Sequence, residues 1–262
     1  MIDEYHNFLK QYSFRDKAIN GVLAHFKEFK SYCFLSATPI PNNLKPAIFN
    51  DITEYMADWN TTDEITVYPY HTNTPYMVAA KFIKTYQAKG CLNVNGIESK
   101  EAYFFINSVT EIKAILKQTQ LTEDDYRIIC ADNPKNRKTL EGYTISSSAD
   151  APKKFNFITS KSFEGVDFHS ETGLCFVVSN VQNRHTLVSI DMDIPQIVGR
   201  IRTKSNPFRN KVVHIFNTKA TDHYTTFEDM KLIVDEEVKA AQERADMLNN
   251  AKLSEAAIKQ TG

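Results

Sequence analysis

The chain has 262 residues, of which 42% are apolar and 24% charged, and its formal net charge is −1. At roughly 150 residues per domain this length allows one large domain or two modest ones, and the composition excludes collagen-like, low-complexity and disordered proteins. A nearly neutral chain has no general attraction for nucleic acid, so any such contact must be local. Four isolated cysteines and the absence of a signal peptide or long apolar run predict a cytoplasmic protein with no membrane partner.

Residues 1–60 contain little that can build a sheet. Ile2 followed by Asp3 and Glu4 is typical of the end of a buried strand, but almost no strand precedes it. Further along we expect a helix over 17–29, a buried strand over 32–35, a loop over 39–46 and a short helix over 48–59. One strand and a stub do not make a stable parallel sheet, so an incomplete domain with an open strand edge is expected here.

Residues 61–224 alternate between strand and helix patterns. Helices are expected over 76–87, closed by Gly90, and over 109–117. Strands are expected over 65–68, 102–106, 126–130, 155–158, 174–178 and 212–216. Because these strands are continuously apolar, they predict a parallel sheet covered on both faces, an α/β doubly wound domain. Residues 225–262, rich in Ala, Glu, Lys and Leu, predict a helical tail.

The first candidates for chemistry are the adjacent carboxylates Asp3 and Glu4. At a strand end, such a pair suits a metal–nucleotide site in which one carboxylate holds Mg²⁺ and the other orients water. Acid pairs are also common on solvated surfaces, so this pattern is weak by itself. Ser36 and Thr38 follow the strand predicted over 32–35. Their hydroxyls either bridge such a site to a neighbouring element or satisfy a turn.

Two later segments carry groups that bind phosphate. Residues 159–168 place hydroxyls and Gly165 directly after an apolar strand, and Asp167 could accept from a ribose hydroxyl. The competing interpretation is an ordinary polar loop. Arg200 and Arg202 lie near Gly199. An unpaired buried guanidinium costs on the order of several kcal/mol, so these arginines are not expected to be core residues. An arginine that contacts the γ-phosphate of a nucleotide raises the rate of phosphoryl transfer by ~10³–10⁵-fold. The alternative role for either arginine is a surface ion pair.

The order of these segments resembles the superfamily 2 (DEAD/DEAH-like) helicase motor. Asp-Glu-x-His at 3–6, Ser-Ala-Thr at 36–38, Phe-Ile-Asn-Ser at 105–108, Thr-Ser-x-x-x-Glu-Gly-x-Asp-Phe at 159–168 and Gln-x-x-Gly-Arg at 196–200 are similar to its motifs II to VI. The resemblance covers about residues 2–217. It implies two RecA-like domains that close around ATP while a nucleic-acid strand lies across both. Residues 1–60 would then be a remnant of the first domain, residues 61–224 the second domain, and residues 225–262 a carboxyl-terminal extension.

The resemblance also implies a role for each motif residue. Glu4, Arg200 and Arg202 would be catalytic, with Glu4 positioning water and Arg202 a candidate arginine finger. The ATP and Mg²⁺ site would be formed by Asp3, the ligand of the metal, with His6, Gly165, Asp167 and Gln196. Ser36 and Thr38, together with His6, would couple this site to the domain interface. Nucleic-acid phosphates would be contacted by Asn107, Ser108, Thr159 and Ser160.

Two departures from the family limit what this chain does alone. The family's second motif VI arginine follows the first by three positions, where this chain has Thr203, so Arg202 is one residue early. No Gly-x-x-x-x-Gly-Lys-Ser/Thr phosphate loop occurs in the sequence. We therefore expect the carboxyl-terminal part of a helicase, inactive alone. Its expected partners are a nucleic acid, DNA in preference to RNA, and a chain or segment carrying the phosphate loop.

Two other function classes stay open at this point. The first is a non-catalytic nucleic-acid-binding or protein-interaction module derived from a helicase, which the missing phosphate loop favours. The second is another nucleotide-binding enzyme such as a kinase or dehydrogenase. It ranks last because no Gly-x-Gly-x-x-Gly follows a strand.

Overall fold

The computed structural model describes residues 1–40, 42, 45–57, 64–163, 166–190, 193–219, 226, 228–229, 231–232, 234–236 and 239. The chain divides into two compact units, residues 1–218 and 219–262. In the second unit the described residues from 228 onward are helical. Thr226 and Asp229 exchange hydrogen bonds between backbone N–H and side-chain oxygen, as at a helix start. The predicted tail over 225–262 otherwise lies outside the described residues.

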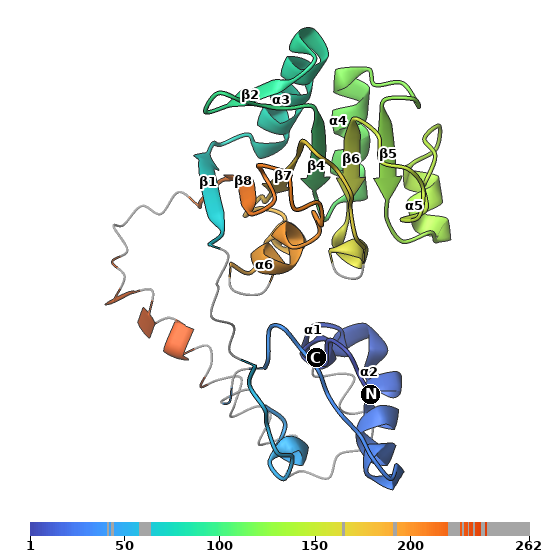
Figure 1. Ribbon diagram of the computed structural model, residues 1–262, viewed down its shortest axis with the longest axis vertical. Helices are drawn as coiled ribbons and strands as arrows, with labels where there is room; N and C mark the ends of the chain where they lie inside the picture. The colour runs from blue at the N-terminus through green and yellow to red at the C-terminus, as the bar shows by residue number, and fades with distance from the viewer. Residues whose placement is uncertain are drawn as a thin grey trace. The chain divides into compact units, whose positions relative to one another are not determined.

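A six-stranded parallel sheet forms the centre of residues 64–218 (Figure 1). Its spatial order is β1-β8-β7-β4-β6-β5, and every neighbouring pair is parallel. The strands are β1 (Thr66–His71), β4 (Glu101–Phe105), β5 (Tyr126–Ile129), β6 (Phe155–Ile158), β7 (Gly173–Val178) and β8 (Lys211–Phe216). The predicted α/β class with a parallel sheet is thus confirmed.

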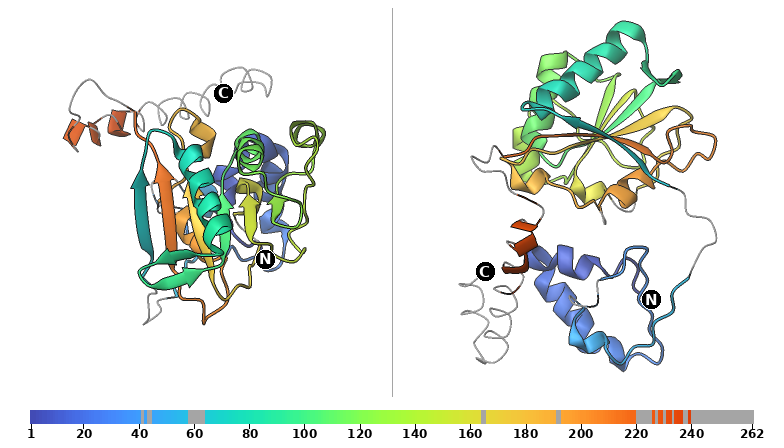
Figure 2. Two further views of the ribbon diagram at one scale, coloured as in Figure 1. Left: turned by 90° about the horizontal axis from the view of Figure 1, so that it is seen from above. Right: turned by 90° about the vertical axis from the view of Figure 1, so that its left-hand side faces the viewer.

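Helices cover the two faces of this sheet, as Figure 2 shows. On one face, α3 (Pro75–Lys89) and α4 (Val109–Thr119) pack against alternate strand residues such as Phe104. On the other face, the 3₁₀ turn η4 (Ser160–Ser162) and α6 (Asp193–Val198) adjoin the intervening residues such as Phe105. Consecutive residues of a strand point to opposite faces, so a continuously apolar strand supplies both cores. Gly90 ends α3 with φ 80°, as predicted.

Residues 1–57 hold α1 (Asn7–Lys10), α2 (Tyr12–His25) and the 3₁₀ turns η1 (Phe26–Glu28) and η3 (Ala47–Phe49). The strand predicted over 32–35 is reduced to one parallel bridge between Ile2 and Phe34. The helix predicted over 17–29 starts earlier and ends at His25.

The helix predicted over 48–59 is wrong across its described residues, where only η3 is helical. Asn50, Asp51 and Thr53 follow that turn. Their short polar side chains compete for backbone hydrogen bonds and so disfavour a helix. Positions 58 and 59 lie outside the described residues.

Several elements of the structure have no counterpart in the sequence expectations. Among them are the hairpin formed by β2 (Leu92–Val94) and β3 (Ile97–Ser99) and the helix α5 (Pro134–Thr139). The hairpin turns at Asn95 and Gly96, whose φ angles of 51° and 85° are both positive. An Asn-Gly pair between apolar residues is a known hairpin signal, so this element was detectable from the sequence.

The edge strand β1 is protected by Pro69. Thr66 donates its N–H to the carbonyl of Asn210, and Thr72 donates to the carbonyl of Phe216. Even-numbered residues of β1 therefore direct their N–H groups toward β8, and odd-numbered ones face the open edge. Pro69 stands at an open-edge position where it offers no N–H, which discourages pairing with another strand.

Gly173 at the start of β7 has no room for a side chain. A Cβ there would lie 2.5 Å from Cε2 of Tyr103 and 2.7 Å from Oγ of Ser170. Gly173→Ala is expected to destabilise the protein by about 1–3 kcal/mol, because the buried Tyr103 ring must shift.

Gly21→Ala is the matched control for Gly173→Ala. Gly21 lies inside α2 with open space around its Cβ position, so alanine should stabilise the helix by up to about 1 kcal/mol. Chemical denaturation of both variants measures the two shifts, and equal stability of Gly173→Ala and the wild type would contradict the prediction.

Candidate functional site

Asp3 and Glu4 lie at the turn between the Ile2 bridge and α1. Oδ1 of Asp3 accepts a hydrogen bond from the backbone N–H of Glu4 at 3.0 Å. Glu4 has φ 52°, a left-handed conformation that costs of order 1–3 kcal/mol outside glycine. Both carboxylates border a hollow of about 270 Å³ lined by residues of α1 and α2.

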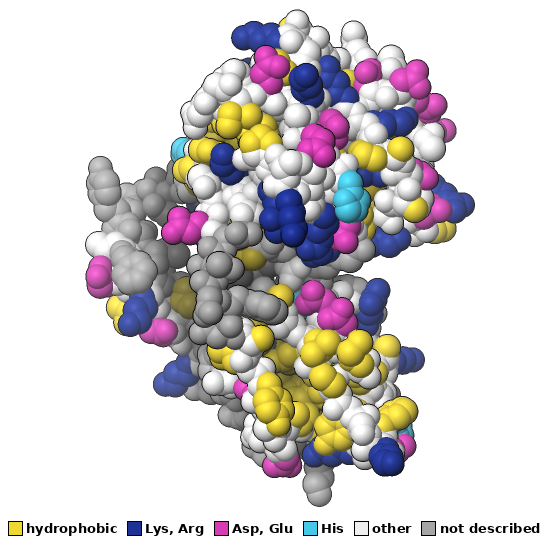
Figure 3. Space-filling model, in the orientation of Figure 1, with side chains coloured by type: hydrophobic (Ala, Val, Ile, Leu, Met, Phe, Trp, Pro, Cys, Tyr) yellow, Lys and Arg dark blue, Asp and Glu magenta, His cyan; other side chains and the backbone are white. Residues whose placement is uncertain are grey.

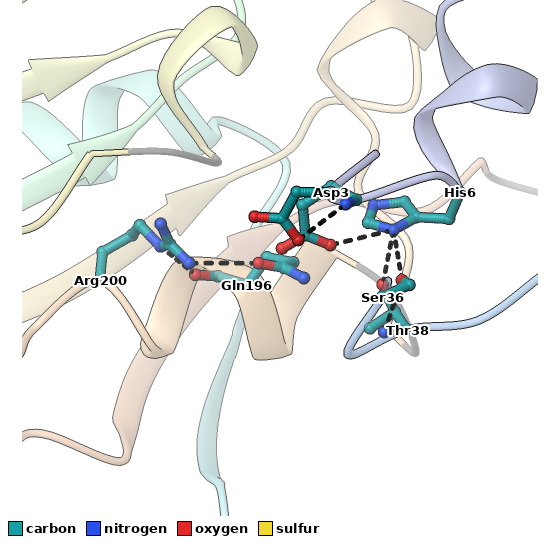
Figure 4. A network of polar contacts seen from close by, with 7 residues as sticks. Asp3, His6, Ser36, Thr38, Gln196 and Arg200 are labelled. Atoms are coloured by element: carbon teal, nitrogen blue, oxygen red, sulfur yellow. Dashed lines mark hydrogen bonds and ion pairs between the residues drawn. The ribbon is translucent and has the colours of Figure 1, made fainter. Parts of the chain in front are cut away.

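His6 is buried and gathers the predicted coupling residues around one ring nitrogen (Figure 4). Nδ1 lies 2.7 Å from Oγ of Ser36, 3.3 Å from Oγ1 of Thr38 and 3.2 Å from Oε2 of Glu4. The backbone N–H of Thr38 donates to Oγ of Ser36 at 3.0 Å. A hydrolytic triad needs its nucleophile and its acid on opposite ring nitrogens. Since Ser36 and Glu4 approach the same nitrogen, this cluster is a connector between residues 3–6 and 36–38.

The carboxylates of Asp3 and Glu4 suit a metal ion that arrives with a nucleotide. Oε2 of Glu4 is buried and accepts no hydrogen bond from the described residues, although His6 approaches it at ion-pair distance. Within the described ranges, no group of three or more His, Cys, Asp or Glu residues could hold a metal ion. Mg²⁺ in nucleotide sites takes one or two carboxylates and completes its shell with phosphate oxygens and water. The donor set therefore fits nucleotide-borne Mg²⁺ better than a resident ion.

Two segments distant in the chain are joined by the backbone beside α6. Phe168 and Ile201 form a parallel bridge. Phe168 donates its N–H to the carbonyl of Arg200 at 2.8 Å, and Arg202 donates its N–H to the carbonyl of Phe168 at 2.9 Å. Gln196-Ile197-Val198-Gly199-Arg200 after Pro195 has the pattern of a helix, but α6 ends at Val198, so Arg200 and Arg202 follow the helix instead of lying on it.

The side chains of these segments form one polar network. Arg200 is buried and donates through Nε to the carbonyl of Gln196 at 2.9 Å and through Nη2 to Oε1 of Gln196 at 3.2 Å (Figure 4). Arg202 is half-exposed and donates through Nε to Oδ1 of Asp167 at 2.8 Å. Nη1 of Arg200 lies 3.8 Å from the same oxygen. The predicted residues Asp167, Gln196, Arg200 and Arg202 thus come together, whereas Gly165 lies outside the described residues.

A polar hollow of about 540 Å³ lies beyond the carboxyl ends of β4, β5, β6 and β7. All four residues predicted to contact nucleic acid line it: Asn107, Ser108, Thr159 and Ser160. The sequence reasoning missed other lining residues, which are Val109, Thr110, Glu111, Ala131, Lys135, Asn136, Thr139, Lys161, Asn183 and His185. Lysines are frequent on every protein surface, so nothing in the sequence distinguishes Lys135 and Lys161 from others. Asn183 and His185 lie on the segment that follows β7, and that segment borders the hollow.

The walls of this polar hollow favour an anion. Lys135 and Lys161 contribute positive charge, and α4 begins at Val109 with its positively polarised end at the hollow. Ser108 caps this helix by accepting from the N–H of Glu111. Of the described lining residues only Glu111 carries a carboxylate, and burial raises its pKa. A phosphate group matches this balance of charge.

No helix within the described ranges is long and apolar enough to cross a membrane. The chain matches no model of a known protein family. A search among curated proteins likewise finds no match for it. What the chain does must therefore be inferred from its own residues.

Proposed function

We propose that this chain supplies motifs II to VI of an ATP-dependent superfamily 2 helicase or translocase, with residues 61–224 as its second RecA-like domain. The observation that carries the proposal is the composition of the polar hollow. Asn107 and Ser108 follow β4, Thr159 and Ser160 follow β6, and all four line one hollow. The resemblance implies that these four residues belong to the site that receives nucleic-acid phosphates. Their convergence on one hollow beside two lysines supports a phosphate site at this place.

In this proposal the segment 159–168 connects strand binding to nucleotide chemistry. Its first residues line the polar hollow, while Asp167 near its end pairs with Arg202 and approaches Arg200. Phe168 is joined to the backbone of both arginines. A phosphate bound in the hollow that shifts the start of this segment would therefore act on the residues at its end that contact the arginines. Coupling of this kind is what a nucleic-acid-stimulated ATPase requires.

The amino-terminal residues would take the other side of the nucleotide. Asp3 would hold Mg²⁺, Glu4 would orient the attacking water, and the His6–Ser36–Thr38 cluster would keep their turn in place. When bound, Mg²⁺ neutralises charge on the phosphates. Gln196 and Arg200 would reach the nucleotide from the second domain, where a fixed cation stabilises charge that develops during transfer.

Hydrolysis in this proposal also needs a phosphate loop, which a partner chain or a further segment would contribute. Residues 1–57 expose large apolar side chains, including Met1, Phe29, Tyr32 and Leu35. Figure 3 shows yellow apolar surface over this part of the chain. Exposed apolar patches on a protein frequently mark interaction surfaces. A polypeptide that adds strands beside the Ile2–Phe34 bridge would cover them and complete the first domain.

Binding of labelled single-stranded oligonucleotides to the full chain tests the proposal. We expect saturable binding that weakens steeply between 50 and 200 mM salt, by about tenfold or more, because phosphate contacts release counterions. The chain alone should not hydrolyse ATP. Binding of a DNA oligomer and an RNA oligomer of equal length, followed by fluorescence anisotropy, also tests the expected preference for DNA. No binding of either at low salt would overturn the proposal.

A second candidate is a nucleic-acid-binding module that has lost ATP chemistry, which the missing phosphate loop favours. The two candidate functions differ in whether a partner that carries a phosphate loop restores ATP hydrolysis. Under the motor proposal, a phosphate-loop polypeptide that co-purifies with this chain should restore strand-stimulated hydrolysis, and Glu4→Gln should remove it. Under the second candidate, strand binding would persist and no partner would restore hydrolysis.

A further inference from the structure

Asn107 uses its side chain inside the protein. Its Nδ2 donates to the carbonyl of His185 at 2.6 Å. Its Oδ1 accepts from the backbone N–H of Ser160 at 3.2 Å and from Oγ of Ser160 at 2.7 Å. The amide thus joins the loop after β6 to the loop after β7. Both lone-pair sites of Oδ1 and one N–H are occupied, which leaves little capacity for a phosphate.

Two hydroxyls and a second amide that line the polar hollow are similarly engaged. The Ser160 hydroxyl donates to Asn107, and the buried Thr159 hydroxyl points toward the carbonyl of Ile129 at 3.4 Å. Asn136 donates its Nδ2 to the carbonyl of Ala131 at 2.8 Å. These side chains therefore hold the loops in position instead of presenting donors to the hollow.

Lys135 and Lys161 also line the polar hollow, and their side chains do not hold the loops together. They belong to α5 and η4, which follow β5 and β6. Both are exposed, and neither ammonium group forms a hydrogen bond or ion pair with any residue in the described part of the chain. The carboxylate of Asp132, which senses the charge of Lys161, is held by Arg137 through bonds of 2.6 and 2.8 Å. Arg137 thus engages this carboxylate directly, whereas Lys161 forms no ion pair with it.

We propose that Lys135 and Lys161 are the phosphate-contacting residues of the polar hollow and that Asn107 is a positioning residue that does not touch the strand. The inference rests on the proposed function and specifies how that function is carried out. The ligand is the phosphodiester backbone of a single strand, as the proposed function requires, and the hollow of about 540 Å³ would receive part of it. Lys135 on α5 and Lys161 on η4 would contact that strand, and Asn107 would fix the segment that carries Lys161.

The salt dependence of oligonucleotide binding identifies the residues that neutralise phosphate charge. On single strands the slope of log K against log salt is about −0.7 for each phosphate neutralised. Lys135→Gln and Lys161→Gln should each make the slope shallower by about 0.7, which is an affinity loss of about fivefold at 0.1 M salt. Asn107 is uncharged, so its role is tested by a double-mutant cycle. Asn107→Leu should lower affinity in the wild-type chain and have little effect in the Lys161→Gln background, because it acts by positioning the loop that carries Lys161.

Two further variants complete the experiment, which uses the full chain and a labelled oligo-dT. Lys89→Gln removes the same charge at the end of α3, outside the hollow lining, and should keep the wild-type slope. Ser160→Ala removes the hydroxyl contact to Asn107 and keeps the backbone one, so it tests the positioning role even if Asn107→Leu folds poorly. Its effect should also be small in the Lys161→Gln background.

The possible failures are distinguishable. Wild-type slopes for both lysine variants, with binding otherwise intact, would overturn the lysine assignment and leave the proposed function standing. Additive affinity losses for Asn107→Leu and Lys161→Gln in the double variant would overturn the positioning role, because a residue that acts through Lys161 has no effect of its own once that charge is removed. Absence of binding by the wild-type chain would instead overturn the proposed function itself.

Discussion

Arg200→Ala is expected to lower strand-stimulated ATP hydrolysis by about 10³-fold or more in a motor assembled from this chain and a phosphate-loop polypeptide. Arg200 is buried, and two hydrogen bonds to Gln196 hold its guanidinium in a fixed orientation. A charge that is already oriented stabilises the transition state without reorganisation during the reaction. The measurement is the initial rate of phosphate release at saturating ATP and oligonucleotide.

Three further variants test whether the loss of activity is specific to the guanidinium of Arg200. Arg200→Lys keeps the charge but loses the forked geometry, so intermediate activity is expected. Arg202→Ala tests the finger role directly, because Arg202 is half-exposed and held only by an exposed pair of modest strength. Lys204 is an exposed cation in the same loop, and Lys204→Ala should leave turnover unchanged.

The thermal stability of each variant must be measured together with its hydrolysis rate, since an unpaired Gln196 oxygen costs about 1–3 kcal/mol. Normal stimulated turnover in Arg200→Ala would remove this residue from the site.

Phe104→Ala should produce the largest loss of stability, about 3–5 kcal/mol. Phe104 is fully buried on β4, and its ring stacks on Phe157 and Phe176 with centroid distances of 5.6 and 4.7 Å. Truncation removes the central ring of this stack and leaves a cavity between β4 and the strands on either side. Since native domains are stable by only about 5–15 kcal/mol, a third or more of the total would be lost.

Phe29→Ala is the control for this prediction. Phe29 is 67% exposed, so its truncation should change stability by no more than about 0.5 kcal/mol. Urea denaturation followed by circular dichroism compares the two variants. A loss below about 1 kcal/mol for Phe104→Ala would show that the stacked rings do not form the core, because cavity formation alone costs more than that.

The strands of the sheet were predictable, but their spatial order was not. Runs such as Tyr103–Phe104–Phe105 are apolar at every position, and a strand buried on both faces requires this. The pairing of β4 with β6 and β7, instead of with β5, depends on which crossovers pack best over the whole sheet. No local pattern encodes that choice.

Residues 1–57 show the opposite case, in which local patterns failed. The stretch 32–35 has the composition of a strand, yet it reaches only a single bridge with Ile2, because a strand is stabilised by neighbours and the described residues supply just that one contact. The predicted helix over 48–59 failed because its apolar spacing was outweighed by short polar side chains. Both errors reflect the limited weight of local propensity where tertiary packing is sparse.

The sequence by itself determined which residue types could carry chemistry here: the Asp3–Glu4 pair, the hydroxyls after β6 and the arginines after α6. It did so because side-chain chemistry and its position relative to a strand end are local properties. Only the tertiary structure decided that Asn107 is engaged with Ser160 and His185, and that Asp167 pairs with Arg202. Each of these contacts joins residues far apart in the chain. Such contacts exist only once the parallel strands bring their carboxyl ends to one edge of the sheet.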